Sequence, residues 1–390
     1  MQQGVDCVKI MQFSDSFIPI MDGVGNVVYQ YALNMAQKGH ECYAVAPQTD
    51  TGFRGSFPFE IVDYIGVPLL RMKSYRVGAP ILDVHCQNRL NAIRADIVHV
   101  HSPFIAGHAG IAYAQKNGLP VVGTFHSKYY DDFMQVTGIE LLVEVGVKHV
   151  VNFYEKCTEV WAVSESSADT LRGYGFTGPI RVMPNGTDIH PVDDAAVAEA
   201  GERFGLGDET VLLFVGQINW KKNLKCILEA CARVDRPFRL VLAGQGPHAR
   251  EAAQLADSLG LGQKVSFIGH ITDQRLLNGL YRRASLFVFP SLYDTSGLVV
   301  REAAAVRTPS VVVRGSSAAE GIRDGENGFL CENDPDDLAR VIDAALSDPA
   351  RLARVGDRAL ETIPIPWSQL VDQVIGHYGR IIEKQGGLKG

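Results

Sequence analysis

Two acidic side chains eight positions apart provide the clearest chemical signal in this sequence. Asp294 follows an apolar run at residues 284–289, and Glu302 lies about two helical turns beyond a Ser296-Gly297 turn. A helix that begins at this turn presents unpaired backbone N–H groups and the positive end of its dipole, which bind anions such as a diphosphate. Carboxylates on either side of that anion can hold sugar hydroxyls. The pattern therefore predicts a nucleotide-sugar site.

A pair of lysines marks a second candidate segment. Residues 214–223 are a short apolar run followed by a polar loop that contains Lys221 and Lys222. At the carboxyl end of a strand, a lysine can meet a diphosphate as a point charge. Most paired lysines are simply solvated, but the position of this loop favours a functional role for Lys222.

Glycines and histidines supply further candidates at strand ends. Gly23 and Gly25 precede an expected helix at about residues 26–38, where close approach to a phosphate and an ordinary strand-to-helix turn are equally good interpretations. The segment lacks the GxGxxG pattern, so a dinucleotide has little support. His126 leaves its strand toward the presumed ligand cleft, whereas we expect His101 only to pack or cap.

Apolar runs that alternate with amphipathic helical segments must position these residues. This is the βαβ pattern of a parallel sheet; it extends from residues 7–13 to 180–183 and restarts at residues 211–215. We predict an α/β fold of two facing Rossmann-like, doubly wound domains with a deep interdomain cleft. The expected domains are residues 1–190 and the nucleotide-sugar-binding residues 191–367, with a helix at about 368–390 packed back onto the first.

Composition excludes several classes of protein. The 390 residues are 46% hydrophobic and 21% charged, which is ordinary for a soluble globular protein. A net charge of −7 argues against a nucleic-acid partner. The seven scattered cysteines show no metal-ligand spacing and indicate reduced thiols. Without an 18-residue apolar run or a signal peptide, we expect a cytoplasmic protein.

A local excess of basic residues leaves a peripheral membrane role open. It lies within residues 71–94, where only Asp83 is acidic, and could meet anionic lipid headgroups at the inner face of the membrane. A solvated helix face is the simpler interpretation. The basic residues are Arg71, Lys73, Arg76, Arg89 and Arg94.

Taken in order, these segments resemble the retaining glycosyltransferases of family 4, which share the GT-B fold. The resemblance covers nearly the whole chain and includes residues 124–126, 182–188, 243–247, 265–269 and 324–330. It implies transfer of a hexosyl group from a nucleoside-diphosphate sugar to an acceptor hydroxyl, with retention of anomeric configuration. UDP-glucose is the donor that the family favours, and neither a metal nor another cofactor is expected.

The resemblance also implies roles for single residues. The paired acids of the family, E-x7-E, fall on Asp294 and Glu302; Glu302 would bind the ribose and Asp294 the hydroxyls of the donor sugar. The basic pair of the family falls on Gln217 and Lys222, and its histidine near the donor sugar falls on His126. The remaining donor-binding positions, where the backbone faces the phosphates and sugar, are Gly23, Gly25, Ser296, Gly297, Leu298 and Val299.

Two departures from the family pattern leave alternatives open. Asp294 replaces glutamate and is one methylene shorter, and Gln217 replaces arginine, which removes a permanent charge. A charge-assisted hydrogen bond is about twice as strong as a neutral one, so turnover could fall unless Lys221 compensates. A non-catalytic nucleotide-sugar-binding partner of another transferase is therefore one alternative. An epimerase or hydrolase acting on nucleotide-sugars is another.

The acceptor is the least determined part of the reaction. Residues 294–298 and 101–104 resemble enzymes that glucosylate diacylglycerol, so a lipid is the leading acceptor. A soluble sugar or a natural product remains the alternative.

Overall fold

The computed structural model describes residues 7–18, 22–48, 56–68 and 76–387. The chain divides into two compact units: unit 1 comprises residues 1–186 together with 367–390, and unit 2 comprises residues 187–366. This division falls slightly before the boundary expected after residue 190. Within the described ranges, no helix combines the length and the apolar character that a membrane span requires.

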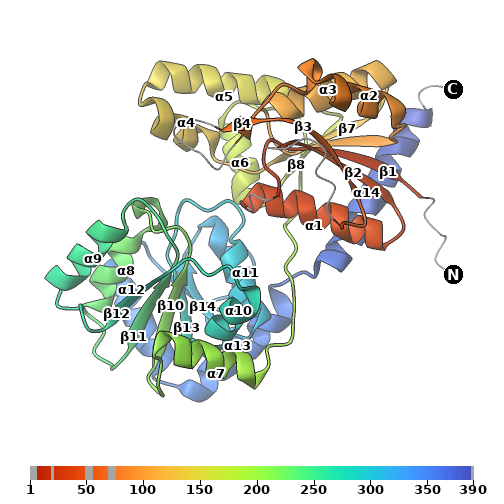
Figure 1. Ribbon diagram of the computed structural model, residues 1–390. Coiled ribbons are helices and arrows are strands. Elements are labelled where there is room, and N and C mark those ends of the chain that lie inside the picture. Colours follow the sequence, from red (N-terminus) through yellow and green to blue (C-terminus); the bar gives the residue numbers. More distant parts are fainter. Residues whose placement is uncertain (1–6, 19–21, 49–55, 69–75, 388–390) are drawn as a thin grey trace. The chain divides into compact units, whose positions relative to one another are not determined.

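Unit 1 is built on a seven-stranded parallel sheet in the order β3-β2-β1-β6-β7-β8-β9 (Figure 1). A separate antiparallel pair joins β4 to β5. The strands are β1 Lys9–Phe13, β2 Glu41–Gln48, β3 Glu60–Ile65, β4 Val67–Pro68, β5 Arg76–Val77, β6 Ile97–Val100, β7 Val121–Phe125, β8 Glu159–Ala162 and β9 Ile180–Val182.

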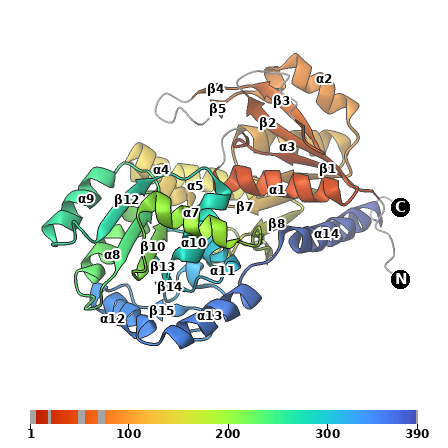
Figure 2. The same ribbon diagram turned by 60° about the horizontal axis from the view of Figure 1, so that its bottom comes forward.

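Helices cover both faces of this sheet, with α1 and α14 packed together on one face and α2 and α3 on the other (Figure 2). The last helix joins unit 1 because its Tyr378 ring stacks on Trp161 of β8, with ring centroids 5.6 Å apart and both side chains fully buried. The helices are α1 Gly23–Gln37, α2 Val84–Ala92, α3 Ile105–Asn117, α4 Tyr129–Thr137, α5 Glu140–Tyr154, α6 Glu165–Gly173 and α14 Trp367–Gly387, with a 3₁₀ turn at Pro80–Leu82.

The start of α1 corrects one expectation. Gly23 and Gly25 were expected in a loop ahead of a helix at about residue 26, but α1 begins at Gly23. Asp22 is the N-cap, and its carboxylate accepts a 2.7 Å hydrogen bond from the N–H of Gly25. This cap satisfies one of the unpaired N–H groups of the first turn, so both glycines belong to the helix.

Unit 2 repeats the architecture with a six-stranded parallel sheet in the order β12-β11-β10-β13-β14-β15. One layer of helices holds α8, α9 and α12, and the other holds α7, α10, α11 and α13 (Figure 1). The strands are β10 Val211–Val215, β11 Arg239–Ala243, β12 Val265–Gly269, β13 Leu286–Phe289, β14 Ser310–Val313 and β15 Phe329–Cys331.

The helices of unit 2 are α7 Asp194–Phe204, α8 Leu224–Cys231, α9 Ala249–Ser258, α10 Gln274–Arg283, α11 Leu298–Ala305, α12 Pro335–Leu346 and α13 Pro349–Thr362. Short 3₁₀ turns lie at Trp220–Lys222 and Ser317–Ala319. Strands covered on both faces are almost entirely apolar, as in Leu286–Phe289 of β13, where all four side chains are buried. The predicted fold class, two doubly wound α/β sheets, is confirmed.

Candidate functional site

Two loops at the carboxyl edge of the unit 2 sheet are locked together through their backbones. The N–H of Gly216, after β10, donates to the carbonyl of Ala243, and the N–H of Ile218 donates to the carbonyl of Gln245. A Cβ atom on Gly244 would lie 1.8 Å from the carbonyl oxygen of Gly216, so only glycine permits this approach. The lysine-bearing loop is therefore held against the sheet edge.

Lys222 forms an ion pair with Asp294 within this edge. Its Nζ lies 2.6 Å from Asp294 Oδ2, and the Lys222 and Asp294 side chains are 19% and 18% exposed. Nζ of Lys221 lies 4.3 Å from the centre of the Tyr293 ring. The structure thus brings together two of the predicted residues, Lys222 and Asp294, while both lysines lie near the ring of Tyr293.

Two residues that sequence reasoning missed brace this pair. Asn223 adopts a left-handed backbone conformation, with φ of 61°, and its amide donates to the carbonyl of Pro290 at the end of β13. Ser317 donates its hydroxyl to the backbone carbonyl of Asp294. Asn tolerates the left-handed region better than most residues, but the sequence carries no signal for either partner.

The helix α11 begins where it was predicted. Gly297 is its N-cap, with φ of 58°, and a Cβ there would lie 3.0 Å from the Cα of Ala318. The N–H groups of Val300 and Arg301 both donate to the carbonyl of Gly297, so the hydrogen bonds within the helix begin with these two residues. The earlier backbone N–H groups, at Leu298 and Val299, have no acceptor within the helix and face its start.

Glu302 lies in α11 and bonds to a different partner from Asp294. Its Oε2 accepts a 3.1 Å hydrogen bond from the hydroxyl of Tyr281 in α10. Burial raises the pKa of Glu302 to about 7; the Tyr281 bond opposes this rise and the nearby charge of Asp188 adds to it. Nothing in the sequence pattern identified Tyr281, because its contact with Glu302 depends on how two helices pack.

Gln217, at the position of the expected arginine, is exposed. Its Oε1 accepts a long hydrogen bond, 3.4 Å, from the side chain of Asn219. Asn219 in turn accepts from the N–H of Lys221 and begins the 3₁₀ turn that carries Lys222. The side chain of Gln217 is thus fixed by one long hydrogen bond.

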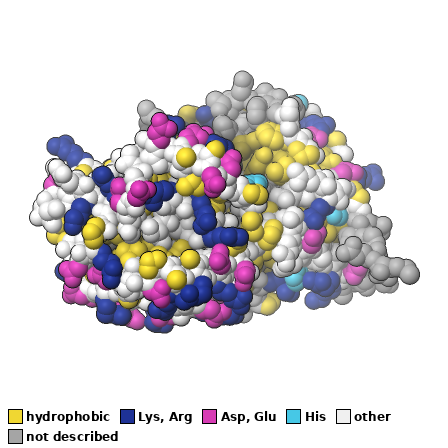
Figure 3. Space-filling model, turned by 90° about the horizontal axis from the view of Figure 1, so that it is seen from below, with side chains coloured by type: hydrophobic (Ala, Val, Ile, Leu, Met, Phe, Trp, Pro, Cys, Tyr) yellow, Lys and Arg dark blue, Asp and Glu magenta, His cyan; other side chains and the backbone are white. Residues whose placement is uncertain are grey.

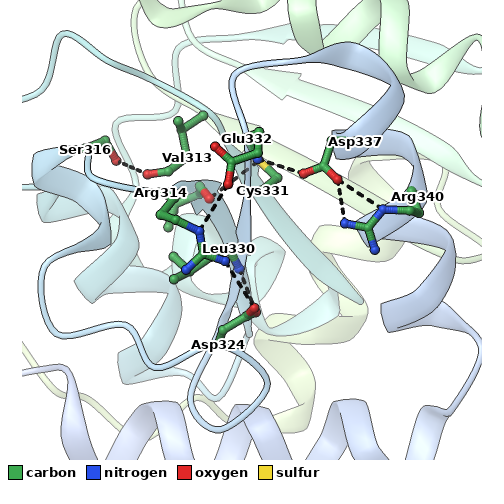
Figure 4. A network of polar contacts seen from close by, with 10 residues as sticks. Val313, Arg314, Ser316, Asp324, Leu330, Cys331, Glu332, Asp337 and Arg340 are labelled. Carbon is green, nitrogen blue, oxygen red and sulfur yellow. Dashed lines mark hydrogen bonds and ion pairs between the residues drawn. The ribbon is translucent and has the colours of Figure 1, made fainter.

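A network of polar contacts in unit 2 connects β14, β15 and α12 (Figure 4). Arg314 bridges Glu332 and Asp324 at 3.2 and 3.5 Å, and Asp324 also accepts from the N–H of Leu330. Ser316 donates its hydroxyl to the carbonyl of Val313. Single exposed ion pairs add little stability. We infer that the network as a whole holds the turn that carries Ser317.

In unit 1, His126 occupies the carboxyl end of β7. It is 6% exposed, and its Nε2 lies 3.2 Å from Nδ1 of His101, which follows β6. Burial lowers the pKa of His126 to about 3 and holds the pKa of His101 well below its usual range, with His99 and His126 adding to the effect at His101. Both rings are therefore neutral near pH 7. His101 was expected only to pack or cap, and in the structure it is buried and hydrogen-bonded to His126.

The predicted residues thus form two groups, each described within its own unit. His126, Gly23 and Gly25 belong to unit 1; the other predicted residues belong to unit 2. Among the residues that the structure describes, no three or more His, Cys, Asp or Glu side chains are grouped to hold a metal ion.

The structure describes only part of the basic segment at residues 71–94. Arg71 and Lys73 lie outside the described residues. Arg89 pairs with Glu60, and Arg76 donates to the backbone carbonyl of Gly66. At least one of these charges is therefore neutralised within unit 1.

Comparison with known proteins agrees with this architecture. Residues 21–190 match the family described as Glycosyltransferase Family 4, and residues 200–362 match the family described as Glycosyl transferases group 1. The structure resembles that of Anabaena Alr3699/HepE in complex with UDP and glucose, with a TM-score of 0.77, 18% identity, and coverage of 96% of this chain and 100% of that one. The fold is therefore GT-B.

Two curated relatives extend the comparison. D-inositol 3-phosphate glycosyltransferase 1 of Catenulispora acidiphila is 30% identical over 321 residues, which span 74% of this chain and 73% of the relative. Alpha-monoglucosyldiacylglycerol synthase of Streptococcus pneumoniae is 26% identical over 357 residues, 88% of this chain and 79% of the relative. The chain belongs to glycosyltransferase family 4 and is a nucleotide-sugar-dependent glycosyltransferase.

Proposed function

We propose that this glycosyltransferase moves a hexosyl group from a nucleoside-diphosphate sugar to an acceptor hydroxyl, with retention of anomeric configuration. The observation that carries the proposal is the ion pair of Lys222 and Asp294, which holds the cation of Lys222 against a carboxylate that lies four residues before α11 begins. A diphosphate at the helix start would meet the cation, and the attached sugar would meet the carboxylate.

The departing diphosphate is the main electrostatic demand of this reaction. Lys222 and the backbone N–H groups of residues 296–299 would stabilise the negative charge that develops as the bond to the sugar breaks. Preorganised charges and N–H groups of this kind are usually the largest contribution to catalysis. Because the loop of Lys222 is locked at Gly216 and Gly244, little reorganisation is needed when the charge forms.

The other predicted residues would hold the sugar and the nucleoside. Asp294 would accept hydrogen bonds from hydroxyls of the donor sugar, and the carboxylate of Glu302 would accept those of the ribose. His126, which is neutral, would act as a fixed hydrogen-bonding group near the sugar and not as an acid or base. Gly23 and Gly25, in the first turn of α1, would lie against the phosphates.

Retention of configuration is consistent with attack on the face from which the diphosphate leaves. In this step the bond between the anomeric carbon and the diphosphate oxygen breaks, and its electron pair stays on that oxygen. The acceptor oxygen then bonds to the same carbon and passes its proton to the departing phosphate. The protein contributes charge stabilisation and orientation, and no side chain becomes covalently attached.

UDP-glucose and a lipid such as diacylglycerol are our specific proposals for donor and acceptor. The relative from Streptococcus pneumoniae supports the lipid, since its name describes synthesis of a glucosyldiacylglycerol. The relative from Catenulispora acidiphila favours the alternative, a soluble acceptor, because its name describes transfer to an inositol phosphate.

An uneven distribution of exposed apolar side chains also supports a lipid acceptor. Of the fourteen large hydrophobic side chains that are exposed among the described residues, twelve lie in unit 1 between residues 65 and 145. Figure 3 shows hydrophobic side chains gathered over part of unit 1. Concentrations of this kind mark interaction sites for proteins, membranes or apolar ligands.

Five of these side chains surround the connection between α4 and α5: Val136, Ile139, Leu141, Leu142 and Val145. The exposed Phe104, at the start of α3, contacts α4 through the ring of Tyr129, with centroids 5.7 Å apart. Helix α4 begins three residues after His126, and Phe104 and Tyr129 lie at that end of the helix, whereas the five apolar side chains lie at and beyond its other end.

Donor preference can be tested first by thermal shift with UDP-, GDP- and ADP-sugars. The preferred donor is then incubated with diacylglycerol in neutral vesicles and, separately, with soluble sugars and inositol phosphate. Product mass identifies the acceptor, and the proton coupling at the anomeric centre reports retention. We expect Glu302→Ala to abolish measurable transfer; a wild-type rate in that variant would rule out the assigned donor site.

Two other results would replace the proposal. Donor binding without turnover on any acceptor would favour a non-catalytic partner of another transferase. Interconversion or hydrolysis of the nucleotide-sugar without an acceptor would favour an epimerase or hydrolase.

A further inference from the structure

A buried hydrogen-bonded chain runs through the carboxyl edge of the unit 1 sheet. Gln12 of β1, His101 after β6 and His126 after β7 are 0%, 0% and 6% exposed. His101 Nε2 lies 3.2 Å from Gln12 Oε1, and His101 Nδ1 lies 3.2 Å from His126 Nε2. Both nitrogens of His101 are therefore engaged, one on each side of the ring.

The direction of the chain follows from the chemistry of its first member. A neutral imidazole carries one N–H and one lone pair, and an amide oxygen can only accept. Gln12 turns its Oε1 toward His101 and leaves its own buried Nε2 without a partner; in this amide orientation His101 donates from Nε2 to Gln12, and its Nδ1 is an acceptor. His126 must then donate from Nε2, and its own Nδ1 carries a lone pair.

Neighbouring rings keep His101 from turning over. Its ring stacks on His99 with centroids 4.0 Å apart and on His126 with centroids 5.4 Å apart, and Tyr31 meets it edge-on at 6.0 Å. His99 is itself held by hydrogen bonds at both nitrogens, between Nδ1 and the hydroxyl of Tyr378 at 2.5 Å and between Nε2 and the hydroxyl of Thr124 at 2.7 Å. An exchange of the two nitrogens of His101 would require this stack to open.

We propose that His101 is a positioning residue: it fixes His126 as the Nε2–H tautomer, so that the Nδ1 lone pair of His126 accepts a hydrogen bond from a hydroxyl of the donor sugar. Within the described residues, no side chain or backbone group bonds to His126 Nδ1, so this acceptor is available. The second half of the inference, that the hydroxyl belongs to the donor sugar, rests on the proposed function.

The tautomers can be observed without any enzymatic assay. In protein labelled with ¹⁵N-histidine, two-dimensional ¹H–¹⁵N spectra distinguish protonated from unprotonated ring nitrogens. We expect Nε2–H and a bare Nδ1 for both His101 and His126. The His101→Leu variant should leave His126 as a mixture of tautomers, and His101→Asn, whose amide oxygen can replace the lost acceptor, should restore one form.

Gln12→Met supplies a second route if His101→Leu does not fold. It removes the acceptor of the His101 proton while keeping a similar side-chain volume, and it should also produce mixed tautomers. Wild-type spectra with the proton on Nδ1 of either ring would overturn the inference, as would a single unchanged His126 tautomer in all three variants.

Kinetics separate positioning from a purely structural role. We expect His101→Leu to lower kcat about tenfold with little change in KM for the donor, and His101→Asn to recover most of the loss. In a His126→Ala background, His101→Leu should have no further effect, because the group on which it acts is gone. An equal loss in both backgrounds would show that His101 only packs.

The outcome remains distinguishable from failure of the proposed function. If the wild-type protein transfers no sugar, donor affinity is measured by calorimetry for the wild type, for His101→Leu, for His126→Ala and for the double variant. If the tautomers are as predicted but the effects of His101→Leu and His126→Ala on donor affinity simply add, the positioning role is contradicted. If His101→Leu has no effect once His126 is replaced, the role is supported whether or not transfer occurs.

Discussion

Lys222 Nζ and Asp294 Oδ2 lie 2.6 Å apart although the two residues are separated by 72 positions in the sequence. The carboxylate holds the ammonium group at the edge of the unit 2 sheet, where the loops after β10 and β13 meet. A bound diphosphate would compete with Asp294 for this ammonium group. Asp294 would then be free to turn toward sugar hydroxyls, so that donor binding and sugar recognition share one ion pair.

Replacement of Lys222 by methionine should therefore lower kcat about 100-fold, within the range measured when one preorganised electrostatic contact is removed. Lys221→Met is a matched control, since Nζ of Lys221 lies 4.3 Å from the centre of the Tyr293 ring, whereas the ion pair with Asp294 is made by Lys222. Steady-state rates with the preferred donor make the comparison. Equal losses in the two variants would show that only the general charge of the loop matters.

Donor affinity should depend on pH through Glu302. Its pKa of about 7 means that Glu302 is roughly half protonated in the free protein at neutral pH, while the proposed hydrogen bonds from the ribose need the carboxylate. Binding must then release a proton below pH 7, and affinity should fall up to tenfold for each pH unit lost there and level off above pH 8.

Calorimetry with an intact nucleotide-sugar between pH 5.5 and 8.5 tests this dependence, because the esterified diphosphate has no proton to lose in that range. Glu302→Gln should bind more weakly and without this pH dependence. A variant that retains the wild-type profile would assign the titration to another group.

Arginine at position 217 should increase activity. Gln217 is exposed and makes a single 3.4 Å bond to Asn219, so a longer side chain can be accommodated without disturbing the core. The guanidinium would add a positive charge to those of Lys221 and Lys222 in the loop that we propose meets the diphosphate, and we expect kcat to rise on the order of tenfold. Gln217→Lys is the control, because lysine supplies the same charge without the two parallel N–H groups of the guanidinium. Unchanged turnover in both variants would place residue 217 away from the diphosphate.

Gly244→Ala should destabilise unit 2 by about 3 kcal/mol, at the upper end of the cost of overpacking. The reason is the 1.8 Å approach of an added Cβ to the carbonyl oxygen of Gly216. Gly379→Ala, in α14 and with no atom within 4 Å of its added Cβ, should be neutral or stabilising by up to about 1 kcal/mol. Thermal unfolding of both variants makes the comparison, and similar midpoints would refute the proposed close packing of the two loops.

Much of the fold could be predicted because each doubly covered strand is a continuous apolar run. Runs such as residues 211–215 and 286–289 are confirmed as β10 and β13. β3 was missed because Glu60 and Asp63 interrupt its apolar pattern, although Asp63 is only 2% exposed. β15 was missed because three residues, Phe329–Cys331, are too short to show any period.

Single candidates could also be chosen from the sequence, since the carboxyl ends of parallel strands are where ligands bind in such folds. Lys222, Asp294 and His126 could be selected in this way from residues of the same types elsewhere in the chain. Tyr281, Asn223 and Ser317 were not found, because the position of a residue along the chain does not show which side chains it will contact.

The order of apolar and polar residues along the chain by itself determined that two parallel sheets form and that charged residues and a glycine turn stand at their carboxyl edge. Tertiary structure alone decided that Lys222 pairs with Asp294, and that His101 bonds to His126. The physical reason is that backbone periodicity depends on neighbours three or four residues away, whereas a hydrogen bond between side chains depends on loops brought together by the packing of distant strands.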